Sequence, residues 1–206
     1  MDNKIKWIFF DVGSTLVDET KAYDHRIRDM IDGTNITFEQ FREKRLYFAR
    51  QNLNGDLEAI KYFGLTRTAW HSEDEFPYPN AEDILQYLCD KGYKIGIIAN
   101  QSAGTAERLK KWGLLKYIDV VASSAELGVS KPDRGIFEKA FEEAGCTAQD
   151  SVMVGDRLDN DIIPANKLGM TTVWIRQGLA VCQNPRMEEE QPDHIVDDLS
   201  DLKEIF

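Results

Sequence analysis

The stretch IKWIFFDVGSTLVDE, residues 5–19, decides which fold this chain is expected to adopt. It opens with a largely apolar run that predicts a buried β-strand, and the run stops abruptly at Asp11. Gly13, Ser14 and Thr15 follow, and residues of these types favour a turn. A strand that delivers a carboxylate into such a turn is typical of a ligand site at the carboxyl end of a parallel sheet.

Composition limits the classes of partner that this protein can have. The 206 residues are 42% hydrophobic and 30% charged, which fits one globular domain, alone or with a small insertion. A net charge of −11 opposes nucleic acid and anionic membranes as partners. It also opposes an anionic substrate, so a phosphate site would need a local cation. Three cysteines without metal-binding spacing and the lack of an apolar leader or span predict a soluble, cytoplasmic protein.

Apolar runs alternate with helical patterns from Gly92 to the end of the chain. The expected strands are 93–100, 118–123, 151–156 and 171–176, and the expected helices are 105–113, 134–145 and 160–169. Each helix pattern closes on a glycine, the usual stop signal. With the first strand added, the pattern predicts an α/β fold with a doubly wound, Rossmann-like parallel sheet.

Residues 20–75 have helix-period apolar positions and no strand pattern. They predict helices at 22–31, 37–53 and 56–64, inserted after the first strand. We therefore expect a core domain formed by residues 1–18 and 77–206 and a helical cap formed by residues 19–76. The chain then returns through a helix within 75–88, for which Asn80 is the expected N-cap. The acidic tail predicts a short strand and a short helix.

Polar side chains follow several of the predicted strands. Asp11, Asn100 and Asp156 come directly after apolar runs, and Lys131 lies one loop beyond another. Because parallel strands end at the same edge of a sheet, these four groups should meet at one rim.

Four short motifs carry a family resemblance. They are DVGSTL at 11–16, IIANQS at 97–102, SKPD at 130–133 and GDRLDND at 155–161. Together they make the chain resemble the haloacid dehalogenase-like hydrolase superfamily over essentially its whole length. The helical insertion also lies where that family has a helical cap.

The resemblance implies a phosphatase that acts through Asp11. This residue would attack the phosphoryl group and form an aspartyl-phosphate. Mg²⁺ would be bound by Asp11, the backbone carbonyl of Gly13 and Asp156, an all-oxygen set that this ion prefers.

The same resemblance assigns the remaining polar residues. Lys131 would hold the Asp11 carboxylate and the phosphate together. Asp161 would support the metal shell or Lys131, although Asp159 is equally close in sequence. The residues implied to bind phosphate are Gly13, Ser14, Thr15, Asn100 and Lys131.

Two departures from the family pattern weaken this picture. Gly13 stands where the family has its acid/base aspartate, a group whose help is typically worth ~10²–10⁴ in rate. Ala99 stands where the second motif has a hydroxyl, which Ser102 or Ser14 would have to replace. An aspartate introduced at position 13 is expected to raise activity on alkyl phosphates. The candidates for a replacement acid from the cap side are Asp18, Glu19, Asp24 and His25.

Three functions therefore stay open from the sequence. The first is a weak or specialised phosphatase that acts on a small phosphorylated metabolite. The second is a dehalogenase-type hydrolase that uses Asp11 on carbon, and the third is a non-catalytic protein that binds phosphate and metal. The sequence leaves the substrate and the oligomeric state undetermined. Basic residues of the cap fit either an anionic substrate tail or a charged helix face, and they are Arg26, Arg28, Arg42, Lys44 and Arg45.

Overall fold

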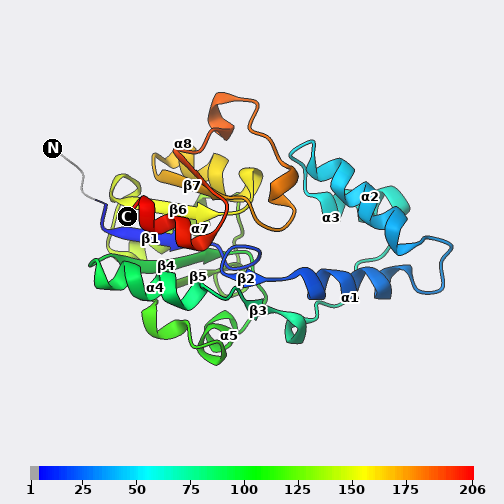
Figure 1. The fold of residues 1–206 in the computed structure, drawn as a ribbon, viewed down its shortest axis with the longest axis horizontal. Coiled ribbons are helices and arrows are strands. Elements are labelled where there is room, and N and C mark those ends of the chain that lie inside the picture. Colours follow the sequence, from blue (N-terminus) through cyan, green and yellow to red (C-terminus); the bar gives the residue numbers. More distant parts are fainter. Residues whose placement is uncertain (1–4) are drawn as a thin grey trace.

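A computed structural model describes residues 5–206, and it contains a six-stranded sheet with helices on both faces (Figure 1). The strand order is β5-β4-β1-β6-β7-β8, and every neighbouring pair is parallel. The strands are β1 (Trp7–Phe10), β4 (Lys94–Ala99), β5 (Val120–Ser123), β6 (Ser151–Gly155), β7 (Thr171–Ile175) and β8 (His194–Val196). The prediction of a doubly wound parallel α/β fold is confirmed.

Two layers of helices cover the sheet because its strands are apolar on both faces. Ile8 and Phe10 of β1 pack on the side of α4, whereas Phe9 packs on the side of α7. The first layer consists of α4 (Ala81–Asp90), α5 (Thr105–Lys111) and a 3-10 helix, Leu199–Glu204. The second consists of α7 (Arg134–Ala144) and α8 (Ile163–Leu168), and a short helix, α6 (Ser124–Leu127), follows β5. Burial on both sides explains why the central strands are continuously apolar.

Three helices form a separate helical unit beside the sheet (Figure 1). They are α1 (Thr20–Ile31), α2 (Phe38–Ala49) and α3 (Gly55–Phe63). Their small core includes Ile27, Phe41 and Ala59, all fully buried. The helix ends follow local rules, since Thr37 and Gln40 form a capping box at the start of α2. The unit lies where a cap was expected, and the division into two domains stays a prediction.

Two strands tie the helical unit to the core. β2 (Val17–Asp18) pairs antiparallel with β3 (Phe76–Pro77), so the chain leaves and re-enters the core side by side. Only Glu19 separates β2 from α1. The position of α1 therefore fixes the position of Glu19.

Several details differ from the sequence-based expectations. The helix expected at 160–169 starts as a π-helical turn, Leu158–Ile162, and continues as α8. Asn80 precedes α4 as expected, but its side chain makes no capping bond and donates to Asp198. The tail helix is a 3-10 helix. Within residues 5–206, no helix combines the length and apolar character that a membrane span needs.

Candidate active site

Three neighbouring strands bring the predicted polar residues to one rim. Because β4, β1 and β6 are adjacent and parallel, Asn100, Asp11 and Asp156 leave the sheet at the same edge. One carboxylate oxygen each from Asp11, Asp156 and Asp161 lies within 4.8 Å of the other two. Together with Lys131 we call these three aspartates the rim cluster.

Lys131 lies at the centre of the rim cluster. Its Nζ is 2.6 Å from Asp11 Oδ1 and 2.6 Å from Asp161 Oδ1, and its side chain is only 1% exposed. Burial acts to lower the pKa of Lys131, but the two carboxylates outweigh it and raise that pKa, so the ammonium stays charged. Asn100 holds the loop, because its Nδ2 donates to the Lys131 carbonyl at 2.8 Å and its Oδ1 accepts from the Lys131 N–H at 2.7 Å.

The rim cluster contains more negative than positive charge. Burial, opposed by Lys131 and reinforced by Asp161, raises the pKa of Asp11 to about 6. Burial and the two other aspartates raise the pKa of Asp156 well above its usual range. The Asp156 carboxylate has no hydrogen-bond donor among residues 5–206. Two buried carboxylates and the half-buried Asp11 against one ammonium, with the Asp156 carboxylate free of donors, fit the binding of a divalent cation by oxygen ligands.

The structure separates the two aspartates that the sequence could not distinguish. Asp161 accepts from Lys131 through Oδ1 and from the Arg157 N–H through Oδ2 at 3.0 Å, so both its oxygens are engaged. Asp159 instead pairs with the half-buried Arg157 guanidinium. A Cβ on Gly155 would lie 2.4 Å from Asp161 Cγ, so glycine at the end of β6 makes room for Asp161.

In the turn after Asp11, most backbone N–H groups donate hydrogen bonds to carbonyls of the turn itself. The Ser14 N–H donates to Val17 O at 2.7 Å and the Thr15 N–H to Val12 O at 3.3 Å. Among residues 5–206, the Gly13 N–H has no acceptor, and the Thr15 hydroxyl oxygen is buried without a partner. The predicted phosphate-binding residues thus lie together, but two of the three turn amides already have acceptors. Their role with phosphate stays a prediction.

Two clefts lie between the rim and the helical unit, and Tyr23 lines both. The first, of about 220 Å³, is lined by Ser14, Asp156 and Arg157 from the core and by Tyr23 and Arg45 from the helices. The second cleft has a volume of about 190 Å³, and both the core and the cap side contribute to it. Its lining residues are Glu19, Tyr23, Arg26, Arg67, Trp70, Asn100, Gln101 and Ser102. Asp11 is not among the residues that line either cleft, but its neighbours Asp156 and Asn100 line the first and the second, so a molecule held in either cleft would touch both the core and the helical unit.

Glu19 lies beside Gly13, a position that the sequence did not predict. Its carboxyl oxygens and Cδ occupy the space beside Gly13, within 2.3–2.5 Å of where a Cβ on that glycine would stand. Burial, with further contributions from Asp11 and Glu75, raises the pKa of Glu19 to about 8. No local sequence signal distinguishes it from Asp18.

The other three candidates for a replacement acid have different partners. Asp18 Oδ1 accepts from the Thr20 N–H at 2.8 Å. His25 Nδ1 lies 2.8 Å from Asp74 Oδ2. Asp24 lines the first cleft.

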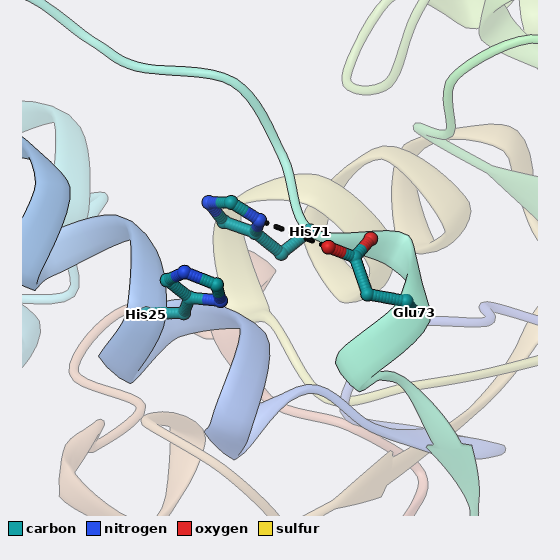
Figure 2. Close-up of side chains that lie close together, drawn as sticks. All are labelled: His25, His71 and Glu73. Carbon is teal, nitrogen blue, oxygen red and sulfur yellow. Dashed lines mark hydrogen bonds and ion pairs between the residues drawn. The ribbon is translucent and has the colours of Figure 1, made fainter.

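A second group of polar side chains lies where α1 contacts residues 71–74, the segment that leads from the helical unit back to the core (Figure 2). His71 Nε2 is 2.6 Å from Asp29 Oδ2, and His71 Nδ1 is 3.1 Å from Glu73 Oε1. The His25 and His71 rings stack with centroids 3.5 Å apart and planes 7° apart. Together with Asp74, we call these residues the hinge cluster.

The stacking of the two imidazole rings argues against a metal site in the hinge cluster. An imidazole nitrogen binds a metal along a lone pair that lies in the ring plane. Two parallel rings 3.5 Å apart therefore cannot both aim at one ion, and His71 already has both nitrogens in hydrogen bonds. We interpret the hinge cluster as an ion-pair network between α1 and the returning chain.

Comparisons with known proteins agree with the fold and the motifs. Residues 8–175 match the family model described as "Haloacid dehalogenase-like hydrolase". The chain is 30% identical to a glyceraldehyde 3-phosphate phosphatase of Methanothermobacter thermautotrophicus, with 98% of this chain and 100% of that protein covered. It is 31% identical to a protein of the same name from Methanopyrus kandleri, with 98% and 97% covered.

A solved structure extends this likeness to three dimensions. The crystal structure of an HAD phosphatase from Thermococcus onnurineus is 27% identical to this chain and superposes with a TM-score of 0.68. The match covers 98% of this chain and 97% of that one. The helical unit is thus part of the shared architecture as well as the sheet.

Proposed function

The chain belongs to the haloacid dehalogenase-like hydrolase family, and from this we propose that it is a Mg²⁺-dependent phosphatase whose nucleophile is Asp11. The observation that supports this most strongly is the rim cluster. Its three carboxylates lie within 4.8 Å of one another, and Lys131 is 2.6 Å from one oxygen of Asp11. A buried excess of negative charge at a cleft is costly unless a cation offsets it, and a bound divalent cation would in turn attract an anionic phosphate.

In the proposed reaction, an oxygen of Asp11 attacks phosphorus and displaces the alcohol, which leaves an aspartyl-phosphate. Lys131 keeps one Asp11 oxygen fixed and offsets charge that develops on the phosphoryl oxygens. Asp161 and Asn100 position Lys131 through its ammonium and its backbone. Mg²⁺, held by Asp11, the Gly13 carbonyl and Asp156, supplies Lewis-acid stabilisation of the phosphoryl charge when bound.

The second cleft supports a small anionic substrate. Arg26 Nε is buried with no hydrogen-bond partner among residues 5–206, and its guanidinium lies 4.1 Å from the Trp70 ring centroid. Burial and the nearby Arg67 lower the pKa of Arg26, so two cations face the cleft close together. Such a pair favours an anionic ligand. The names of the archaeal relatives point to phosphorylated metabolites of a few carbon atoms.

The test compares the wild-type protein with Asp11→Asn on p-nitrophenyl phosphate, with Mg²⁺ and with a chelator. We expect Asp11→Asn to lower turnover at least about 10³-fold, because an amide cannot replace the nucleophile. The matched control is Asp159→Asn, which removes a half-buried carboxylate that pairs with Arg157 and makes no contact with Lys131, and it should keep near-wild-type turnover. Mg²⁺ should also raise the melting temperature of the wild type, and Asp156→Asn should abolish that shift.

Two outcomes would contradict the proposal. Equal background release by the wild type and Asp11→Asn would favour a non-catalytic binding protein. Halide release from a 2-haloacid, without phosphate release, would favour the dehalogenase-type reaction on carbon.

A further inference from the structure

We propose that Glu19 is the acid/base residue of this enzyme and replaces the group that the chain lacks at position 13. The inference rests on the proposed phosphatase function, and it concerns the proton transfers rather than the nucleophile. It assigns a catalytic role to a residue outside the four motifs.

The first argument is the coincidence of two positions in space. A Cβ built on Gly13 would lie 2.3 Å from Glu19 Oε1 and 2.5 Å from Oε2 and Cδ. The Glu19 carboxyl therefore fills the space in which a side chain at position 13 would begin. Gly13 is not among the glycines with positive φ, so its backbone conformation does not demand glycine. What requires glycine there is the space taken by Glu19.

The second argument is the surroundings of the carboxyl. Glu19 is 8% exposed and lines the second cleft together with Asn100 and Arg26, between the rim and the helical unit. Its hydrogen-bond donors are neutral: the Ser14 hydroxyl lies 3.5 Å from Oε2, and the Gln101 side chain is a second donor. A carboxyl buried without a basic partner is costly to the fold, which favours a functional reason for its presence.

A purely structural role for Glu19 fits poorly. Glu19 occupies the N-cap position of α1, but its side chain makes no capping hydrogen bond. The neighbouring Asp18 makes the local bond instead, since its Oδ1 accepts from the Thr20 N–H. The two adjacent acids therefore differ in role, and Asp18 is a natural control.

The chemistry balances with Glu19 as a proton carrier. As Asp11 forms its bond to phosphorus, the bond from phosphorus to the leaving oxygen breaks, and the Glu19 proton passes to that oxygen to give the alcohol. The Glu19 carboxylate then takes a proton from water while the water oxygen attacks phosphorus and the bond to Asp11 breaks. Inorganic phosphate leaves, and both residues return to their starting states. An alkoxide needs the proton far more than p-nitrophenolate does.

The test measures phosphoenzyme formation and its decay in Glu19→Gln. Formation from glycerol phosphate, an alkyl phosphate, should slow by ~10²–10⁴, whereas formation from p-nitrophenyl phosphate should change by less than about 10-fold. Because the water attack also loses its base, p-nitrophenol should appear as a burst followed by slow turnover, with phosphoenzyme accumulating. Asp18→Asn, the matched control, should resemble the wild type on both substrates. A purely structural defect would slow both substrates alike.

A double variant tests the position of the carboxyl directly. Gly13→Asp alone would drive its side chain into the Glu19 carboxyl, so the simple restoration expected from the sequence should give little gain. Glu19→Ala combined with Gly13→Asp frees that space and returns a carboxyl to it. We expect at least about 10-fold recovery on glycerol phosphate over Glu19→Ala, part of the usual worth of an acid/base group.

The outcomes separate this inference from the proposed function. If the wild type forms no phosphoenzyme, the phosphatase proposal fails. If the wild type forms one but Glu19→Gln is unchanged, or is slowed equally on both substrates, the role of Glu19 alone is overturned. Absence of any recovery in the double variant, with the protein folded by circular dichroism, would also overturn it.

Discussion

The rim cluster and the hinge cluster both gather ligand-type side chains, yet only one has the properties of a reactive site. In the rim cluster, Lys131 and Asp161 have side chains 1% exposed, and the one ammonium contacts two of three clustered carboxylates, Asp11 and Asp161. In the hinge cluster, His25 is 45% exposed, and two imidazoles are paired with neighbouring carboxylates in an open network. Exposed pairs are weakly coupled, whereas buried unbalanced charge is strongly coupled. Burial and charge balance distinguish the rim cluster from the hinge cluster, whereas the number of ligand-type side chains does not.

The largest expected difference comes from removing the cation of the rim cluster. Lys131→Met should cost about 3–5 kcal/mol in the free energy of unfolding, because it leaves buried carboxylates without their partner. It should also lower turnover by roughly 10²-fold or more. Chemical denaturation at neutral pH and steady-state kinetics measure the two effects.

The control for Lys131 is another lysine–aspartate pair. Lys94 Nζ is 2.8 Å from Asp119 Oδ1 at the surface, and Lys94→Met should change neither stability nor turnover measurably. Similar losses in both variants would show that the rim cluster is no more than an ordinary ion pair.

A smaller effect should follow from crowding the rim cluster without changing its charge. Gly155→Ala places a methyl group 2.4 Å from Asp161 Cγ, in a strand whose neighbours are buried. We expect a loss of about 1–3 kcal/mol in stability and a lower turnover, because Asp161 must move away from Lys131. Gly135→Ala, where the nearest atom is 3.1 Å away at the end of the Asp133 side chain, is the control. An unchanged melting temperature for Gly155→Ala would contradict this packing.

The smallest effect belongs to the hinge cluster and depends on pH. Hydrogen bonds to Asp29 and Glu73 raise the pKa of His71 above its usual value of 6.5. The folded state thus binds this proton more tightly than the unfolded state does. The resulting stabilisation is complete below about pH 6.5 and fades as pH rises through the raised pKa.

Titration of the His71 ring by NMR checks this sign. Its pKa should lie above 6.5 in the wild type and fall towards 6.5 in Asp29→Asn, with turnover nearly unchanged at neutral pH. Equal values in the two proteins would show that the network does not hold the proton.

Much of the fold follows from local signals in the chain. The sequence predicted the apolar strands, which are buried on both faces. It also predicted the ends of α7 and α8, where Gly145 and Gly169 adopt the left-handed conformation. Each of these features depends on only a few neighbouring residues. The convergence at the rim was also predictable, since Asp11, Asn100 and Asp156 each end a parallel strand.

Other parts of the site depend on contacts that no local pattern encodes. The separation of Asp159 from Asp161 is set by a π-helical turn, which the sequence predicted as an ordinary helix. The place of Glu19 depends on how β2 leads into α1 and on the space left by Gly13. The sequence indicated that an acid was missing at position 13, and only the structure showed that the Glu19 carboxyl occupies the space beside Gly13.

The junction between β2 and α1 has a consequence for the timing of the catalytic cycle. Glu19 immediately precedes α1, so a rotation of the helical unit that widened the clefts for exchange of molecules would also withdraw this carboxyl from Gly13. In the mechanism that we propose, breakdown of the aspartyl-phosphate would then require the closed arrangement, while escape of the first product would require an open one. Such an enzyme would have to close again before it could finish, and premature opening would strand its covalent intermediate.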